Sequence, residues 1–297
     1  MTRRAVLLSS FLALAAPSAF TQDVVKRIGQ VTIRVDQSRA FPGGAIVVRL
    51  SSRGRLGTAF AMLDGRRAPF YLAGGIPRAL VPIPVTAVPG PNTLGIELVA
   101  RGGRQRIPIA VDISSRTYPA RSVVIPEEKR ALLSQPSLSR DGRQLLSLLR
   151  TETTAEPRAL APPITIVAGL GFGGEQTWLG GSPVESLTDA VFGEQHRGVD
   201  FAVPAGTVVM APAAGTVLHA GPLALAGQTV VIDHGQGVVS ALFHLSRIDV
   251  TSAAGVEARA LVGLSGDTGV TATPLVQWRT YVHGVAIDPA VLQQVLN

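Results

Sequence analysis

Short runs of alternating apolar and polar residues fill residues 31–113 and constrain the fold more than any other feature of this chain. Such alternation, with a period of two, is typical of strands that bury one face. Turn signals rich in glycine and proline separate the runs, so short strands at this spacing predict a β-sandwich over residues 23–115. The runs are VTIRVD, AIVVRLSS, TAFAML, RALVPIPV, LGIELVA and RIPIAVDI. The prolines in VPIPV and RIPIAV predict edge strands there.

Residues 116–163 have a different pattern and predict a linker with short helices. PEEKRALL and RDGRQLLSLLR have helical spacing. In the second segment, Leu145, Leu146, Leu148 and Leu149 form an apolar stripe that we expect to pack on a neighbouring domain. The remaining residues, 164–297, form the predicted C-terminal domain.

The N-terminus resembles an export signal. Residues 1–22 contain Arg3 and Arg4, then an apolar run over residues 5–16, then small residues, and the arginine pair is similar to a twin-arginine signal. The run is short for a stable membrane span, so we expect a periplasmic or secreted protein. The alternative is an uncleaved N-terminal anchor. Since the 297-residue chain has no cysteine, disulfides and thiolate metal sites are excluded.

Charge is distributed unevenly along the chain. The net charge is +8 over residues 23–115 and −6 over residues 161–297. A basic exported domain would dock on an anionic polymer or on its own acidic neighbour, and nucleic acid is not an expected partner. The alternative is a solvated, arginine-rich surface, which the presence of only two lysines among 27 basic residues favours.

All five histidines lie in the C-terminal segment, and histidine is the commonest metal ligand and general base. The segments HRGVDFAVPAGTVVMAPAAGTVLHAG, GQTVVIDHGQGVVSALFHLS and GLSGDTG follow one another there. In this order they resemble the lysostaphin-type (LytM-like) zinc metallopeptidases of bacterial cell walls, over roughly residues 190–289. The resemblance implies a C-terminal antiparallel β domain of duplicated, barrel-like form with a groove, in a mainly β chain whose sandwich would be immunoglobulin-like. It also implies a zinc ion that cuts peptide cross-links of peptidoglycan.

The family's site residues are carried over one by one. Its His-x-x-x-Asp ligands fall on His196 and Asp200, and the histidine of its HLS element falls on His244. Its late His-x-His pair, the general base and the third ligand, falls without gaps on Leu275 and Gln277. Leucine cannot ligate a metal, and a neutral amide is a poor substitute for imidazole on zinc. We therefore expect a degenerate member that binds zinc weakly or not at all.

The remaining histidines are predicted to be structural. His283 lies six residues beyond Gln277, roughly 20 Å along an extended strand, and precedes a glycine as a turn residue would. His219 is expected on a strand, packed or partly exposed, and His234 in a turn with a structural hydrogen bond. None of them is expected to complete the metal site.

Three functions are compatible with these residues. The first is a non-catalytic protein that binds peptidoglycan or regulates a cell-wall hydrolase. The second is an active zinc-dependent peptidoglycan endopeptidase with an atypical third ligand. In the third, the C-terminal domain is structural and the basic sandwich does the binding. The lost histidine pair favours the first over the second.

Overall fold

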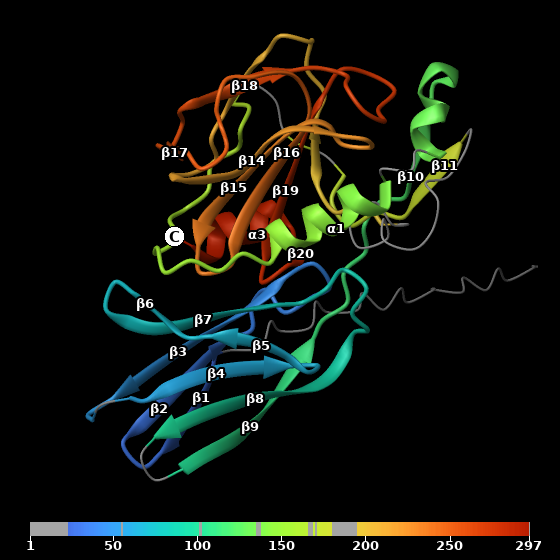
Figure 1. The fold of residues 1–297 in the computed structure, drawn as a ribbon. Coiled ribbons are helices and arrows are strands. Elements are labelled where there is room, and N and C mark those ends of the chain that lie inside the picture. The colour runs from blue at the N-terminus through green and yellow to red at the C-terminus, as the bar shows by residue number, and fades with distance from the viewer. Residues whose placement is uncertain are drawn as a thin grey trace, which may run out of the picture.

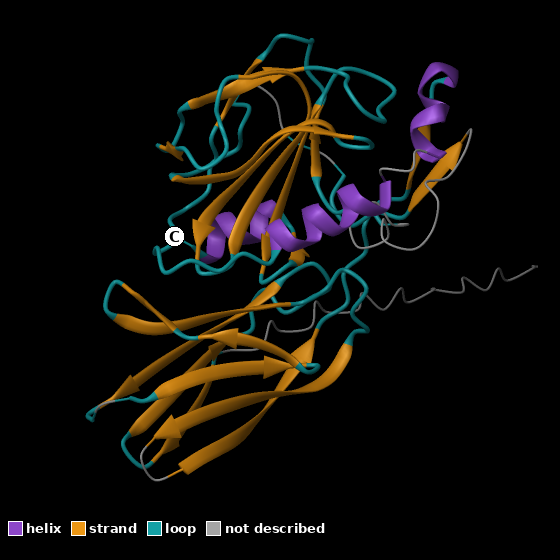
Figure 2. Ribbon diagram, in the orientation of Figure 1, coloured by secondary structure: helices purple, strands orange, loops and turns teal. Residues whose placement is uncertain are grey.

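The structure is a computed structural model, and it confirms a mainly β chain with antiparallel sheets and few helices (Figures 1 and 2). The signal peptide predicted for residues 1–22 lies outside the described residues. In the described part of the chain, no helix is both long and apolar enough to cross a membrane. The structure describes residues 23–54, 56–100, 103–134, 138–165, 169, 171–179 and 195–296.

Two antiparallel sheets form the N-terminal domain, and their inward-facing residues share one apolar core that includes Ile33, Leu50, Ala61 and Ile107. This core follows from the alternation in the sequence, since every second residue of each strand points inward. The immunoglobulin-like topology and the domain boundaries remain predictions. The first sheet has the order β1 (Val24–Ile28), β2 (Val31–Asp36), β3 (Ala45–Ser52), β7 (Ile76–Pro82), β6 (Tyr71–Ala73). The second has the order β5 (Arg66–Pro69), β4 (Thr58–Leu63), β8 (Gly90–Ala100), β9 (Gly103–Ile113).

The two proline-containing segments predicted as edge strands lie at different places in the sandwich. RIPIAV lies in β9, at the end of its sheet, as predicted. β7 lies between β3 and β6 in the sheet order, but β6 pairs only with Ile76–Arg78, so Val81 and Pro82 of VPIPV pair on one side only, with β3. β7 ends at Pro82, and Pro84 lies outside the strand.

The segment between the domains contains the predicted helices and one strand that was not predicted. The 3-10 helix η1 spans Glu127–Ser134, and α1 spans Leu138–Leu149. Leu145 and Leu149 are buried against the C-terminal sheet, as the leucine stripe predicted. Figure 2 shows α1 lying across the strands of that sheet. The additional strand, β10 (Arg121–Val124), pairs in parallel with β11 (Gln176–Leu179).

The C-terminal domain is built around one nine-stranded antiparallel sheet. Glycines allow its closest approaches: at Gly227 (φ +67°), a Cβ atom would lie 2.4 Å from the carbonyl oxygen of Thr268. Helix α3 (Pro289–Val295) follows, and the Asp288 side chain caps its N-terminus. The strand order is β12 (Val199–Phe201), β19 (Val276–Val282), β16 (Val238–Ile248), β15 (Gly227–Gly235), β14 (Gly215–Leu223), β17 (Gly255–Val256), with β20 (Val285–Ile287) beside β19, β18 (Leu261–Ser265) beside β16, and β13 (Val208–Met210) beside β18.

The two domains are joined by a shared apolar core. Val47 and Leu80, on the outer face of the first sandwich sheet, belong to the same buried cluster as Val282 and Val291 of the C-terminal domain. The Asp288 backbone N–H also donates to the carbonyl oxygen of Gly43 across the junction. Figure 1 shows β7 directly beneath the C-terminal domain. The interface is apolar and continuous, so we expect the two domains to behave as one folding unit.

Candidate functional site

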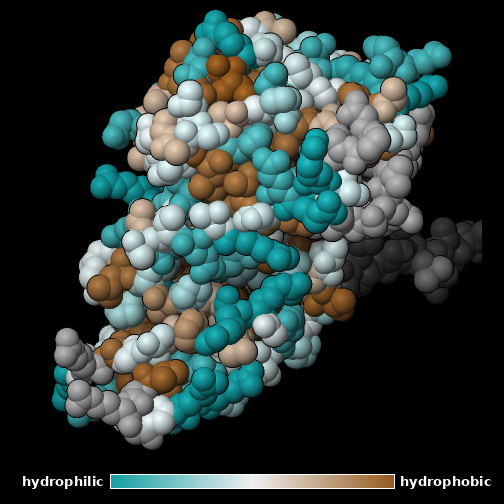
Figure 3. All heavy atoms as spheres, viewed as in Figure 1, coloured by the Kyte–Doolittle hydropathy of each residue, from teal (hydrophilic) through white to brown (hydrophobic). Residues whose placement is uncertain are grey.

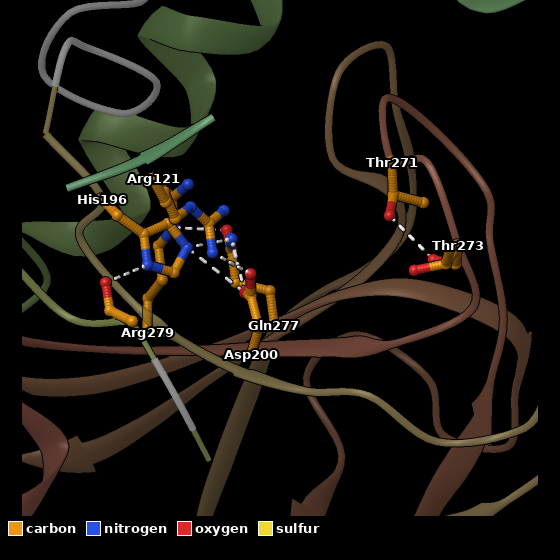
Figure 4. A network of polar contacts seen from close by, with 8 residues as sticks. Arg121, His196, Asp200, Thr271, Thr273, Gln277 and Arg279 are labelled. Carbon is orange, nitrogen blue, oxygen red and sulfur yellow. Dashed lines mark hydrogen bonds and ion pairs between the residues drawn. The ribbon is translucent and has the colours of Figure 1, made fainter. Parts of the chain in front are cut away.

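The residues at the family's ligand positions meet at the antiparallel pair β12–β19. Asp200 lies directly opposite Gln277 in the strand register, and directly opposite residues share one face of a sheet. His196 reaches the same point from the segment just before β12 (Figure 4). Gly198 makes this possible, because a Cβ atom there would lie 2.7 Å from Cγ of Arg279 and 3.0 Å from the Trp278 carbonyl oxygen.

The Gln277 amide is held in one orientation by three hydrogen bonds. Its Oε1 accepts from Nε of Arg279 at 2.7 Å, and since a guanidinium can only donate, this bond fixes the oxygen on that side. The amide nitrogen then donates to Nε2 of His196 at 2.7 Å and to Oδ1 of Asp200 at 2.9 Å. Nδ1 of His196 lies 2.6 Å from the Gly171 carbonyl oxygen, which places the imidazole proton on Nδ1.

Asp200 has a second partner that comes from the linker. Nη1 of Arg121, in β10, donates to Oδ2 of Asp200 at 2.5 Å, and Oδ1 lies 3.2 Å from Nε2 of His196. Burial alone would raise the pKa of Asp200, but the hydrogen bonds and charges around it, the Arg121 guanidinium among them, hold that pKa below its ordinary range. The carboxylate is therefore ionised, and an arginine supplies the positive charge beside it.

These residues do not fit a zinc ion. Catalytic zinc takes three protein ligands and keeps one open position. Here the lone pair of His196 Nε2 and both carboxylate oxygens of Asp200 already accept hydrogen bonds, and the third position presents an amide nitrogen, which is not a ligand. Over the described ranges, no group of three or more His, Cys, Asp or Glu side chains is placed to hold a metal.

A cavity of about 310 Å³ opens beside this network. Leu275 lies two residues before Gln277, and both line the cavity, as the alternation of strand side chains predicts. The other side chains that line it include Arg121, Val123, Asp200, Leu225, His244, Val270, Thr271, Thr273 and Arg279. Figure 4 places Thr271 and Thr273 across a gap from the charged cluster. The lining of the groove is therefore partly apolar, and two arginines and one carboxylate lie together at one side of it.

His244 lines the same cavity but is oriented by backbone contacts. Its φ of 64° is in the left-handed region, and its Nδ1 lies 2.8 Å from the Thr268 carbonyl oxygen. Burial lowers the pKa of His244 to about 4, so the imidazole is neutral at pH 7. Leu275 holds the position of the family's general base, so His244 is a neutral hydrogen-bonding group of the groove wall.

The other three histidines are not brought to the site. His283 lies in the β19–β20 turn and contacts Glu152 at 2.6 Å, and His219 contacts Gln144 and the Gly221 carbonyl oxygen. The prediction that His234 lies in a turn was wrong. It belongs to β15 and is buried, with Nδ1 2.9 Å from the Ala214 carbonyl oxygen and Nε2 2.9 Å from Oγ of Ser240.

The sequence did not reveal the roles of two arginines at the site. Arg121 lies in the segment predicted to be a helical linker, and no motif marks it. Arg279 is not among the residues that the resemblance assigns to the site, whereas its buried guanidinium orients Gln277 and lies 5.1 Å from the Phe243 ring centroid. An arginine two residues after a lost ligand is the only local signal that could have indicated this arrangement.

Acid is expected to destabilise the C-terminal domain through His244. Because burial puts its folded pKa near 4, below the unfolded value of about 6.5, the folded state binds fewer protons between these values. The contribution of His244 to the free energy of unfolding is then fully present above about pH 6.5. It falls as the pH drops towards 4, by up to about 3 kcal/mol. Burial also lowers the pKa of His234, which further reduces the free energy of unfolding at low pH.

Urea unfolding at pH 7.5 and pH 4.5 measures this loss. His244→Asn is the matched variant, because asparagine tolerates left-handed backbone and does not titrate. Its pH dependence should be weaker than that of the unmodified protein by about 3 kcal/mol. An identical loss in both proteins would contradict the assignment.

The C-terminal domain is similar to a known peptidase family. The model of peptidase family M23 matches residues 194–289. The chain is 37% identical over 93 residues to the peptidoglycan DD-endopeptidase ShyA of Vibrio cholerae, covering 31% of this chain and 22% of that protein. It is 35% identical over 102 residues to an uncharacterized metalloprotease of Haemophilus influenzae, covering 33% and 21%. The matches thus span only about a fifth of the length of these two relatives.

One solved structure resembles almost the whole chain. A crystal structure from Pseudomonas aeruginosa assigned to peptidase M23 has a TM-score of 0.61 and 27% identity, and the match covers 86% of this chain and 95% of that one. The similarity therefore includes the N-terminal sandwich as well as the C-terminal sheet.

Proposed function

Residues 194–289 belong to peptidase family M23, and on that premise we propose that this chain is an exported peptidoglycan-binding protein whose peptidase-like site is not catalytic. Its partner is peptidoglycan itself or a cell-wall hydrolase that it regulates. Relatives such as ShyA are peptidoglycan endopeptidases, which makes cell-wall peptide the natural class of ligand. The site of action would be the periplasm or the cell exterior.

The observation that carries this proposal is the bonding of the Gln277 side chain. Its amide nitrogen donates to both His196 and Asp200, while Arg279 holds the amide oxygen. The lone pairs of His196 and Asp200 that a metal would need thus accept hydrogen bonds from the protein itself. Arg121 supplies the positive charge beside Asp200. A fully bonded polar network of this kind favours one rigid arrangement.

The alternative is an active zinc-dependent endopeptidase with an atypical third ligand. It requires the Gln277 oxygen to turn away from Arg279 and towards His196 and Asp200. That rotation would leave a buried guanidinium N–H without its partner, which costs about 1–3 kcal/mol before any metal binds. The network therefore favours the non-catalytic function.

Zinc content and chelation provide the first test. We expect purified protein to contain far less than one zinc ion per chain and to show no band of clearing on peptidoglycan zymograms. Because a large apolar core holds the C-terminal domain, a chelator should change the melting temperature by less than about 1 °C. A fall of about ten degrees, or one tightly bound zinc ion, would support the endopeptidase instead.

Binding to intact sacculi provides the second test. Leu275→Asp puts a charge into the apolar part of the groove lining, and we expect it to reduce sacculus binding at least about tenfold. Leu261→Asp, at an exposed β18 position, is the matched control and should change binding less than about twofold. If both variants bind equally, the groove is not the binding site and the basic sandwich becomes the candidate.

A further inference from the structure

Three arginines lie side by side on the outer face of the first sandwich sheet. Arg34 of β2 is directly opposite Arg49 of β3, which is directly opposite Arg78 of β7. Cβ atoms of directly opposite residues are about 4.5–5.5 Å apart, and like charges at this spacing destabilise a sheet. Figure 1 shows β2, β3 and β7 beneath the C-terminal domain. We call Arg34, Arg49 and Arg78 the arginine row.

The row becomes more buried from β2 towards β7. Arg34 is exposed, Arg49 is half-buried and Arg78 is 9% exposed. Tyr71 of β6 lies opposite Arg78 and is 8% exposed. Nε and Nη2 of Arg78 and the Tyr71 hydroxyl are buried, and no described residue hydrogen-bonds to them. A buried donor without a partner costs about 1–3 kcal/mol, and more when it is charged.

The charges around Arg78 do not neutralise the row. Glu156 and Asp36 attract Arg78 from a distance, and Arg49 repels it. Glu156 already accepts a hydrogen bond from the Gly74 N–H at 2.9 Å. Within the described ranges, no carboxylate forms an ion pair with any member of the arginine row. Burial is the main reason that the pKa of Arg78 is lowered and that of Tyr71 is raised.

The arginine row lies beside the apolar core that the two domains share. Its neighbours Val47 and Leu80, on the same sheet face, pack into the core shared by the two domains. Glu156 belongs to the segment between the domains and bonds to the β6–β7 turn. On the face shown in Figure 3, hydrophobic side chains are scattered among hydrophilic ones, so the sandwich surface there is mixed rather than apolar. The unpaired donors thus lie at the edge of the domain junction.

We propose that Arg49, Arg78 and Tyr71 form an oxyanion-binding site at the domain junction, which takes a phosphate or carboxylate group. A guanidinium presents paired N–H donors that match the oxygens of these groups, and a phenolic hydroxyl can add one more. Arg34, at the exposed end, attracts the anion towards the site. The proposal concerns the sandwich and stands independently of the function proposed for the groove.

Phosphate titration of the full chain tests the site. With sodium chloride balancing the ionic strength, phosphate at about tenfold above its dissociation constant should raise the melting temperature by about 2–4 °C. Arg49→Gln and Arg78→Gln should each weaken phosphate binding at least about tenfold. Arg66→Gln removes the same charge from β5 of the other sheet and should change binding less than about twofold.

A second readout separates binding from a structural role. Without phosphate, Arg78→Gln should not lower the melting temperature, because the change removes a buried, unpaired charge. A loss of stability there, or no phosphate shift beyond that of sodium chloride, would overturn the proposal, as would an effect of Arg66→Gln equal to that of Arg49→Gln. Comparing acetate with phosphate distinguishes the source: stronger stabilisation by phosphate indicates a phosphorylated polymer, and by acetate a carboxylated one.

Discussion

Gln277→His combined with Arg121→Gln is expected to raise zinc affinity at least about 100-fold over the unmodified protein, to near one ion per chain. The first change places an imidazole opposite Asp200 and beside His196, completing three ligands at one point of β12–β19. The second removes the guanidinium from Asp200. A unit charge about 4 Å from another is worth ~4 kcal/mol near a protein surface, so Arg121 opposes any bound cation.

The series of variants separates these contributions. The sequence alone predicts that Gln277→His is sufficient for zinc binding, whereas the position of Arg121 predicts that the single variant binds weakly. Adding Leu275→His to the double variant should produce cleavage on zymograms, because cleavage also needs a general base that leucine cannot provide. Gln105→His, on the exposed β9, is the control and should bind no zinc.

Zinc per chain, measured by mass spectrometry after dialysis, decides between the two expectations. If Gln277→His alone binds as tightly as the double variant, Arg121 does not block the site. If neither binds zinc, the residue at position 277 does not determine zinc binding at this site. Arg279 beside the new imidazole is expected to keep the cleavage rate low, since the guanidinium loses its amide partner.

Leu80→Ala is expected to destabilise both domains together, by about 2–5 kcal/mol. Leu80 is fully buried in the core that the sandwich shares with the C-terminal domain, so truncation leaves a cavity at the junction. Calorimetry of the unmodified protein should show one unfolding transition, since apolar contacts couple the domains. In Leu80→Ala this transition should broaden or divide into two as the coupling weakens.

Leu72→Ala provides the control for this change. Leu72 lies in β6 of the same sheet but is 63% exposed, so its loss should cost less than about 0.5 kcal/mol. Two separate transitions in the unmodified protein, or equal effects of the two variants, would show that the domains fold independently.

Much of the fold could be predicted from local sequence patterns. VTIRVD and TAFAML coincide with β2 and β4, and the leucine stripe lies on α1 with Leu145 and Leu149 buried. These predictions succeed because strand and helix periodicity directly report which face is buried. The prediction of an edge strand at VPIPV holds only for its first two residues, because Val81 and Pro82 pair with β3 alone and β7 ends there.

The candidate site could be predicted only in part. The resemblance to the family assigns His196, Asp200 and Gln277 to its three zinc-ligand positions. The strand register and a hydrogen bond bring these residues together in the structure. The resemblance gave no indication of Arg121, which precedes Asp200 by 79 residues and lies in a four-residue strand. Short strands carry little periodic signal, and a parallel pairing joins segments whose proximity no local pattern encodes.

The sequence by itself indicated the β class, the resemblance to the family, and leucine and glutamine at two of its histidine positions, because these follow from periodicity and residue identity. Only the tertiary structure decided what surrounds Gln277 at the third ligand position. Arg279 decides whether the Gln277 side chain presents its oxygen or its nitrogen to His196. Arg121 decides whether the negative charge of Asp200 is already compensated. The arginine row likewise appears only when β2, β3 and β7 are placed side by side. Hydrogen bonds and charges act over a few ångströms in space, so only the packed chain determines which groups they join.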